Sequence, residues 1–194
     1  MAARPLILAS TSRYRRSLLE RLELPFEVAS PGVDEAPIAG EAPRDRAVRL
    51  SLAKARAVAE EHPGAVVIGS DQVAALGTRV LDKPGDEATC RAQLAALSGN
   101  AAHFFTGCAV VGIEVPLSLE HLDVTTVQFR SLSPAEIERY VAREKPLDCA
   151  GGFKVEALGI TLFERIENSD PTALIGLPLV WLAGALRRAG YALP

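Results

Sequence analysis

Short apolar runs typical of buried strands alternate along the chain with segments whose apolar residues have helical spacing. This alternation predicts an α/β protein. A first apolar run, Pro5 to Ser10, predicts a buried strand, and Leu18, Leu19 and Leu22 then have the spacing of one buried helix face. A second strand is predicted over residues 25–30. Strand, helix and strand in this order make a βαβ-like unit of the kind that builds α/β sheets.

The remainder of the chain continues the alternation. Further helices are predicted over residues 43–61, 87–97, 134–145 and 178–188, and further strands over 65–68, 104–111, 121–129 and 159–163. Gly77 within residues 73–81 predicts a hairpin, and a turn near residues 113–117 lets the strands on either side pair as antiparallel neighbours. Ser133-Pro-Ala-Glu136 reads as a capping box that begins a helix.

Length and hydropathy narrow the class of protein. At 194 residues the chain fits a single domain over residues 1–194, with room for two lobes. No apolar run approaches the roughly 18 residues of a membrane-spanning helix. The run before Ser10 is also too short for the core of a secretory signal. A cytoplasmic protein with no membrane partner is therefore expected.

Charge and cysteine usage exclude further classes. A net charge of −3 gives no overall basic excess, so nucleic acid is not an expected partner and any polyanion site must be local. The three cysteines are far apart and form no CxxC pair, which predicts free thiols rather than a disulfide framework or a zinc site. The three histidines have no metal-binding spacing, and no role is expected for them.

The first candidate for chemistry is the segment from Ser10 to Arg16, where a strand leads into a helix. Free backbone N–H groups and hydroxyls at a helix start form an anion site. Arg13, Arg15 and Arg16 fall in the first turn, where the helix dipole disfavours cations. A bound polyphosphate would compensate for them. The alternative is an ordinary Ser or Thr N-cap followed by solvated arginines.

Carboxylates and lysines supply further candidates. Asp71 is predicted to follow an apolar strand, in a loop where α/β sheets bind ligands, although it could equally be a turn aspartate. Glu35 lies in an acidic loop and is open to the same two interpretations. Lys54, in the 43–61 helix, is expected to project away from the apolar face, and Lys83 follows the predicted hairpin. Either lysine could bind phosphate or simply be exposed.

These candidates fall within an ordered set of motifs that resembles the Maf family of nucleoside triphosphate pyrophosphatases. The matching strings are Ala9-Ser-Thr-Ser-Arg-Tyr-Arg-Arg-Ser-Leu-Leu19, Val33-Asp-Glu35, Ala53-Lys-Ala55, Ile68-Gly-Ser-Asp-Gln72, Asp82-Lys-Pro84, Leu97-Ser-Gly99, Thr106-Gly107, Ala150-Gly151 and Gly176-Leu-Pro178. Each string alone is weak, whereas the ordered set is specific. The resemblance implies a Maf-like (anticodon-binding/ITPase-like) α/β fold, in which helices flank an elongated mixed sheet and two lobes surround a cleft.

The resemblance also implies roles for the candidate residues. Ser10, Arg15, Lys54 and Lys83 would hold the triphosphate of a small-molecule nucleotide substrate. Glu35 and Asp71 would face a divalent metal, Mg²⁺ or Mn²⁺, and the attacking water, with Asp71 as proton acceptor. Such hard cations prefer oxygen ligands. A homodimer is also implied.

Three further positions bear on the choice of base. The dTTP/UTP-type members have arginine, threonine and glutamine where this chain has Tyr14, Gln72 and Glu156. The combination found here resembles the 7-methyl-GTP pyrophosphatase subfamily. N7-methylation makes guanine cationic, so an aromatic ring at Tyr14 would attract it, and Glu156 could accept hydrogen bonds from the guanine edge. The alternative is that Tyr14 packs locally and Glu156 is solvated.

Other functions remain open from the sequence. The substrate could be dTTP or UTP, as in the other branch of the family. The protein could also be a nucleotide-binding regulator of cell division with little turnover. Nucleic-acid binding through the arginine-bearing helix is the third alternative, and the acidic net charge argues against it.

Overall fold

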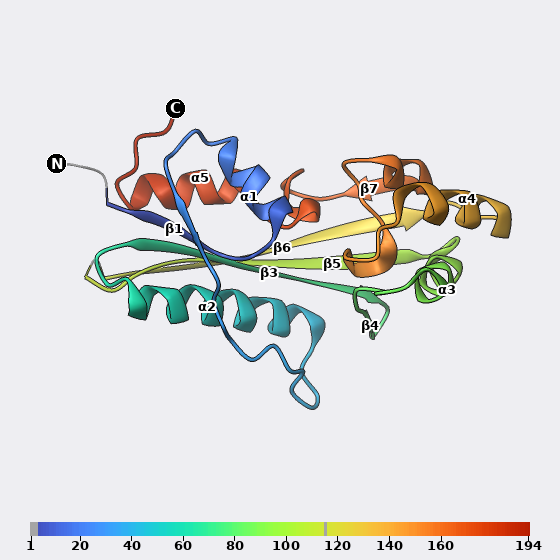
Figure 1. Ribbon diagram of the computed structural model, residues 1–194, viewed down its shortest axis with the longest axis horizontal. Helices are drawn as coiled ribbons and strands as arrows, with labels where there is room; N and C mark the ends of the chain where they lie inside the picture. Colours follow the sequence, from blue (N-terminus) through green and yellow to red (C-terminus); the bar gives the residue numbers. More distant parts are fainter. Residues whose placement is uncertain (1–3, 115) are drawn as a thin grey trace. The chain divides into compact units, whose positions relative to one another are not determined.

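The computed structural model describes residues 4–114 and 116–194, and it confirms the predicted α/β class (Figure 1). Its strands are β1 (Leu6–Ala9), β2 (Glu27–Ala29), β3 (Val66–Leu76), β4 (Arg79–Leu81), β5 (Ala101–Gly112), β6 (Leu117–Phe129) and β7 (Phe163–Glu167). Its α-helices are α1 (Arg13–Glu20), α2 (Pro43–Glu61), α3 (Glu87–Leu97), α4 (Pro134–Glu144) and α5 (Leu179–Arg188). Three short 3₁₀ helices are η1 (Ala150–Gly152), η2 (Leu158–Leu162) and η3 (Ala173–Ile175).

The strands form one mixed sheet in the order β2-β1-β3-β5-β6-β7, with β4 paired to β3. β1 is parallel to both β2 and β3, whereas the β3–β4 and β6–β7 pairs are antiparallel. The parallel pairing of β1 with β2 around α1 confirms the predicted βαβ unit. The β3–β4 hairpin turns at Gly77, as predicted, where φ is +59° and glycine is favoured.

The chain divides into two compact units, each described separately below. Unit 1 comprises the described residues up to Gln72 together with those in 106–123 and 170–194, and unit 2 comprises 73–105 and 124–169. The strands β3, β5 and β6 each contribute residues to both units. The expectations of a single domain over residues 1–194 and of a cleft stay predictions.

Unit 1 has helices on both faces of its strands (Figure 1). Because side chains alternate along a strand, Leu6 and Leu8 of β1 face one core and Ile7 and Ala9 face another. The first core also contains leucines of α1 and α5, and the second contains Ala55, Val58 and Ala59 of α2. This explains why β1 is apolar at every position: both of its faces are buried.

Unit 2 contains a cluster of four phenylalanines. Phe153 packs edge-to-face on Phe104 with ring centroids 5.2 Å apart, and on Phe163 at 4.8 Å. Phe129 packs edge-to-face on Phe163 at 5.0 Å. Edge-to-face pairs at these spacings add to the stabilisation from buried area. The cluster fixes the segment after η1, which carries Phe153, against β5, β6 and β7.

Three sequence predictions need correction. Asp71 lies inside β3, not in a loop beyond a strand, because β3 continues to Leu76. Residues 159–162 belong to η2, and the predicted strand begins only at Phe163, because the Ile160 N–H and the Thr161 hydroxyl donate to carbonyl groups three residues earlier. Lys54 was expected to project away from the apolar face of its helix, but it is only 5% exposed.

The capping box at the start of α4 is confirmed. Ser133 Oγ accepts a hydrogen bond from the Glu136 N–H, and Glu136 Oε2 accepts one from the Ser133 N–H at 2.8 Å. The Ser133 hydroxyl also donates to Glu136 Oε2 at 2.8 Å. The two bonds that Ser133 donates to this carboxylate, together with one from Arg130, lower the pKa of Glu136 from 4.5 to about 2. The ionised carboxylate therefore stabilises the folded chain more than a neutral side chain would.

We expect Glu136→Gln to lower the melting temperature at neutral pH. Because the folded-state pKa is depressed, the charge-dependent stabilisation is present above pH 4.5 and is lost as the pH falls through about 2. The melting temperatures of the wild type and of Glu136→Gln should therefore converge as the pH is lowered from 4.5 to about 2. Glu138→Gln, on the same helix, serves as the control and should leave the pH profile unchanged; a constant gap for Glu136→Gln would contradict the prediction.

Candidate active site

A buried ammonium group forms the centre of the candidate site in unit 1. Lys54 Nζ lies 2.6 Å from Asp71 Oδ1 and 2.8 Å from Glu35 Oε1. The side chains of Lys54 and Asp71 are 6% and 11% exposed, whereas that of Glu35 is 55% exposed. The site thus has a desolvated ion pair at its base and a second carboxylate open to solvent.

Two glycines bring α2 close enough to the sheet to make this contact. A Cβ added to Gly69 of β3 would lie 2.2 Å from the Ser51 carbonyl oxygen and 2.6 Å from the Ala55 nitrogen. A Cβ added to Gly107 of β5 would lie 2.3 Å from the Ala47 carbonyl oxygen. The helix backbone therefore rests directly on the strand backbones, which places Lys54 on the face of the sheet.

The phase of α2 explains why Lys54 is buried. Residues spaced three and four apart share a helix face. The buried residues of α2 are Ala47, Leu50, Ser51, Lys54, Ala55, Val58 and Ala59. Lys54 occupies the middle of this stripe, and a buried charge is tolerated there because carboxylates receive it.

The loop that carries Glu35 is anchored to α2 by two arginines. Arg46 Nη2 donates to the Glu35 carbonyl oxygen at 3.1 Å. Arg49 Nη2 donates to the Ala36 carbonyl oxygen at 3.3 Å, and Arg49 also forms a two-contact ion pair with Glu41 at 2.5 and 2.7 Å. These arginines hold the two peptide groups that flank Ala36, directly after Glu35. The carboxylate is thereby kept over Lys54.

The start of α1 provides a group of cations, as the sequence predicted. Ser12 is the N-cap, its Oγ accepting from the Arg15 N–H at 3.4 Å, and no acidic residue lies in the first turn. Arg15 Nε donates to the Gly176 carbonyl oxygen at 3.0 Å, and Arg15 Nη1 lies 3.5 Å from Ser10 Oγ. Burial lowers the pKa of Arg15, and the charge of Asp71 opposes that effect.

The carbonyl group of Gly176 links Arg15 to Ser70, a polar residue that sequence reasoning did not assign. Ser70 is fully buried, and its Oγ lies 2.9 Å from the Gly176 carbonyl oxygen and 2.8 Å from that of Gly107. Because side chains alternate along β3, Ser70 and Asp71 emerge on opposite faces of the sheet. A serine beside the candidate acid was visible in the sequence, but its partner some 106 residues away was not.

Gln72, predicted to affect specificity, is held within unit 1. Its Nε2 lies 3.0 Å from Thr106 Oγ1 and 3.0 and 3.1 Å from the carbonyl oxygens of Ala173 and Leu174. Thr106 is itself buried and donates to the Ala173 carbonyl oxygen at 3.0 Å. The amide nitrogen of Gln72 is thus occupied in holding η3, the turn that precedes Gly176.

Tyr14 lies beside Arg13 at the start of α1. The Arg13 guanidinium carbon is 4.8 Å from the centre of the Tyr14 ring, and Arg13 Nη2 donates to the Tyr14 hydroxyl at 2.8 Å. The ring therefore already attracts one cation in this structure. The role of Tyr14 in base recognition stays a prediction.

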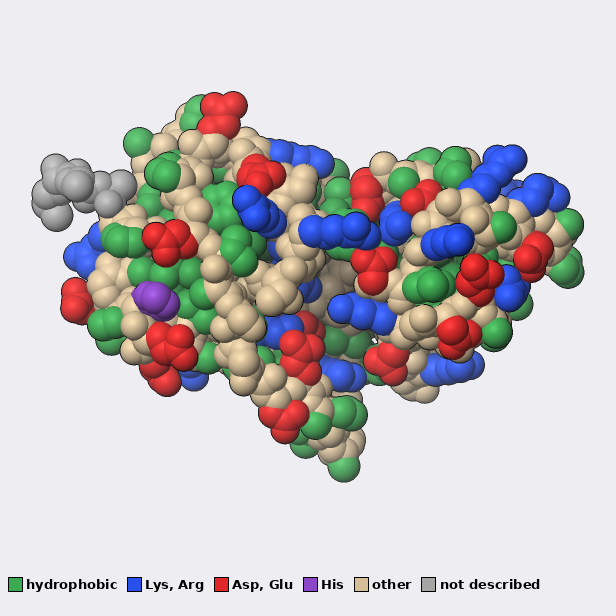
Figure 2. Space-filling view, viewed as in Figure 1, with side chains coloured by type: hydrophobic (Ala, Val, Ile, Leu, Met, Phe, Trp, Pro, Cys, Tyr) green, Lys and Arg blue, Asp and Glu red, His purple; other side chains and the backbone are tan. Residues whose placement is uncertain are grey.

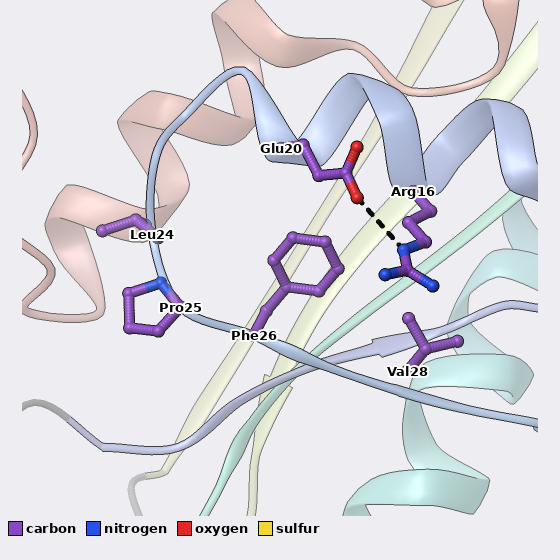
Figure 3. A pocket seen from close by; sticks show the side chains of 6 residues that line it. All are labelled: Arg16, Glu20, Leu24, Pro25, Phe26 and Val28. Atoms are coloured by element: carbon purple, nitrogen blue, oxygen red, sulfur yellow. Dashed lines mark hydrogen bonds and ion pairs between the residues drawn. The ribbon is translucent and has the colours of Figure 1, made fainter.

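Arg16 takes a different position on α1. Its guanidinium pairs with Glu20 at 3.1 Å, and its side chain is 63% exposed. It lines an open hollow of about 370 Å³ together with Leu24, Pro25, Phe26 and Val28, as Figure 3 shows. The contacts of Arg16 therefore join it to this hollow, whereas those of Arg15 join it to Ser10 and Gly176.

Lys83 and Glu156, the other two predicted site residues, belong to unit 2. Both are exposed. Lys83 follows β4 and precedes the buried Pro84, and Glu156 lies in the segment between η1 and η2. Exposure fits both substrate binding and simple solvation, so the roles of Lys83 and Glu156 stay predictions.

The charge distribution and the cysteines agree with the sequence predictions. Basic and acidic side chains are interspersed over the face shown in Figure 2. All three cysteines are free, and burial raises the pKa of Cys90 to about 11 and that of Cys108 further still. These two thiols stay protonated at neutral pH and are poor metal ligands. No helix within residues 4–114 and 116–194 has the length and apolar character to cross a membrane.

Fold and site together define an α/β protein in which a buried lysine gathers two carboxylates beside an arginine-bearing helix start. The model of the family described as Maf-like protein matches residues 5–189, and the chain belongs to this family. A 7-methyl-GTP pyrophosphatase of Xanthomonas oryzae pv. oryzae is 57% identical over 189 residues, which cover 97% of this chain and 98% of that protein.

Two further relatives carry the same name. The 7-methyl-GTP pyrophosphatase of Polaromonas sp. is 53% identical, over 98% of this chain and 87% of its own length. That of Aromatoleum aromaticum is 54% identical, over 97% of both chains. Among solved structures, the Staphylococcus aureus Ham1 protein is 14% identical, with a TM-score of 0.45 over 64% of this chain and 71% of its own.

Proposed function

We propose that this protein hydrolyses 7-methyl-GTP to 7-methyl-GMP and diphosphate, and so removes modified nucleotides from the cellular pool. The observation that carries the proposal is the centre in which Glu35 and Asp71 converge on the buried Lys54. Such a centre can neutralise phosphate charge and activate water within one small region. Three relatives more than half identical to the chain are named for this activity.

In the proposed reaction, one set of residues binds the triphosphate and one carboxylate acts as the base. Arg15, Ser10, Lys54 and Lys83 bind the triphosphate, and Asp71 takes the proton from the water that attacks the α-phosphorus. The bond between the α-phosphate and the bridging oxygen then breaks, and diphosphate leaves. Lysines suit this role as compact point charges, and Arg15 is aimed by its bond to Gly176. Arg16 contributes long-range positive charge from the exposed side of α1.

The carboxylates fit a divalent metal. Glu35 and Asp71 supply hard oxygen donors that already converge on one cation, which is the donor chemistry that Mg²⁺ and Mn²⁺ prefer. Within residues 4–114 and 116–194, no three or more His, Cys, Asp or Glu side chains gather to hold a metal. Phosphate and water oxygens would therefore supply the donors beyond Glu35 and Asp71. When bound, the metal neutralises charge on the phosphates.

Recognition of the base rests on Tyr14, with Glu156 as the partner for the guanine edge. The Arg13 guanidinium lies against the Tyr14 ring, so it would have to leave any ring face that takes a cationic base. Gln72 acts indirectly, since its amide nitrogen is bound to Thr106 and η3. A dTTP/UTP pyrophosphatase remains the alternative enzyme, and a regulator with little turnover the alternative of another class. A cytoplasmic location and a homodimer stay predictions.

A panel of nucleotides tests the proposal. Purified protein with Mg²⁺ or Mn²⁺ is mixed with equal concentrations of 7-methyl-GTP, GTP, dTTP and UTP, and the products are identified by chromatography. We expect diphosphate and 7-methyl-GMP, with 7-methyl-GTP the preferred substrate. Release of orthophosphate alone would contradict the proposed bond cleavage, and preference for dTTP or UTP would assign the chain to the other branch.

The Tyr14→Ala variant tests base recognition within the same panel. Loss of an exposed cation–π contact is expected to reduce the preference for 7-methyl-GTP over GTP by about two- to fivefold. Tyr14→Phe is the matched control, because it keeps the ring and removes only the hydroxyl. An unchanged preference in Tyr14→Ala would show that Tyr14 only packs locally.

A further inference from the structure

Gln93 of α3 has a buried side-chain amide, in which the nitrogen forms a hydrogen bond and the oxygen does not. It is 8% exposed, and its Nε2 donates to the Asp82 carbonyl oxygen at 2.9 Å. Its Oε1 is buried and has no hydrogen-bond partner. A buried acceptor without a partner costs free energy, and such groups are rare in folded proteins. An apolar side chain of similar size would avoid this cost, so the contact with Asp82 is the feature that needs explanation.

The orientation of the amide is fixed by its surroundings. The Asp82 carbonyl group can only accept a hydrogen bond, so the Gln93 nitrogen must face it. The oxygen then points towards η1, where it would lie 3.7 Å from a Cβ added to Gly152. Turning the amide over would place two acceptors against each other at Asp82. The unsatisfied oxygen is thus a direct consequence of the bond to Asp82.

That bond controls the backbone of Lys83. The Asp82 carbonyl group and the Lys83 nitrogen belong to one rigid peptide plane. On the other side, the buried Pro84 has a fixed φ and restricts Lys83 to extended conformations. The Gly85 N–H then donates to the Leu147 carbonyl oxygen at 3.0 Å. The exposed side chain of Lys83 therefore projects from a backbone that is held on both sides.

We propose that Gln93 is a positioning residue, whose amide holds the Asp82–Lys83 peptide so that Lys83 is presented to the substrate triphosphate. The inference rests on the proposed function, because it assigns Lys83 to the phosphates. Gln93 does not touch substrate in this scheme. Its buried oxygen is left without a partner, and in return the backbone next to Lys83 is held in place.

A Gln93→Met variant tests the proposal, because methionine has similar volume but neither donates nor accepts strongly. The melting temperature should be unchanged or raised, since the unsatisfied oxygen is removed and solvent can reach the exposed Asp82. Turnover should nevertheless fall, with kcat/KM for 7-methyl-GTP lowered about three- to tenfold. Gln128→Met is the matched control in unit 2, since Gln128 donates to the Gly99 carbonyl oxygen and contacts nothing in residues 82–85.

A double-mutant cycle with Lys83→Ala separates positioning from general disturbance. If Gln93 acts through Lys83, the Gln93→Met change should have almost no effect on kcat/KM in the Lys83→Ala background. Equal losses in both backgrounds would overturn the proposal. So would a fall in melting temperature large enough to account for the lost activity.

Amide hydrogen exchange supplies a readout that needs no turnover. The Gly85 N–H, which donates to the Leu147 carbonyl oxygen just after Lys83 and Pro84, should exchange faster in Gln93→Met than in the wild type, whereas the amides of β7 should not change. Unchanged exchange at Gly85 would overturn the positioning role whatever the activity. A further outcome is that exchange rises in Gln93→Met although the wild type releases no diphosphate from any nucleoside triphosphate. In that case the positioning of Lys83 stands and the proposed function fails.

Discussion

Replacing Asp71 by Asn is expected to lower kcat for 7-methyl-GTP hydrolysis by about 10²- to 10⁴-fold, which is the usual contribution of a general base. The substitution keeps the shape of the side chain but removes its ability to take a proton. It also leaves the buried Lys54 ammonium with only the exposed Glu35 as counter-charge. Product release measured by chromatography gives kcat, and calorimetry with uncleaved nucleotide gives the affinity.

Stability must be measured beside activity in this variant. Breaking a buried ion pair on one side is destabilising, and the remaining Glu35 limits the loss to about 1–3 kcal/mol. For a chain of this size that corresponds to about 2–12 °C in melting temperature. The variant should therefore still be folded at 25 °C and still bind nucleotide.

Asp34→Asn is the matched control for Asp71→Asn. Asp34 is exposed, one residue before Glu35, and its Oδ1 accepts a hydrogen bond from the Ala36 N–H at 2.9 Å. Asparagine keeps that acceptor, so kcat should stay close to wild type. Full activity in a folded Asp71→Asn protein would remove Asp71 from the role of base.

Replacing Gly69 by Ala should be the most destabilising of the substitutions considered. The added Cβ would meet the Ser51 carbonyl oxygen at 2.2 Å and the Ala55 nitrogen at 2.6 Å, and both are helix backbone atoms that cannot rotate away. Relief requires α2 to move off the sheet. Overpacking of this kind costs about 3 kcal/mol or more, or about 6–12 °C in melting temperature.

Moving α2 should also separate Lys54 from Asp71, so activity is expected to fall further than stability alone explains. The control is Gly184→Ala, in the interior of α5, where an added Cβ has nothing within 4 Å. Alanine favours the helix, and a gain of about 0.5–1 kcal/mol is expected there. A Gly69→Ala protein as stable as the wild type would contradict the close contact between α2 and β3.

The sequence predicted most elements because they depend on local patterns. The helices over 43–61 and 87–97 have the predicted limits, since proline, Asp86 and the closing Ser98-Gly99 mark their ends in the chain itself. The extent of β3 was not predictable in the same way. Its polar centre, Ser70 to Gln72, resembles a loop, and only partners distant in sequence satisfy those side chains within a strand.

Burial of Lys54 is the clearest case in which the sequence misled. A lysine is almost always exposed, so the helical pattern was interpreted with Lys54 on the solvent side. The true phase depends on Gly69 and Gly107, which allow α2 to approach the strands and present two carboxylates to the ammonium. Neither glycine differs in the sequence from one in an ordinary turn.

By itself, the sequence determined the α/β class, the βαβ start, the capping box of α4 and, through an ordered set of motifs, the family. These features depend on spacing and residue type along the chain. Only the tertiary structure decided which side chains meet: that Lys54 joins Glu35 to Asp71, that Gly176 holds Arg15, and that Gln72 binds η3. The physical reason is that desolvated charges and backbone carbonyl groups find their partners through packing, and packing joins residues that the sequence keeps far apart.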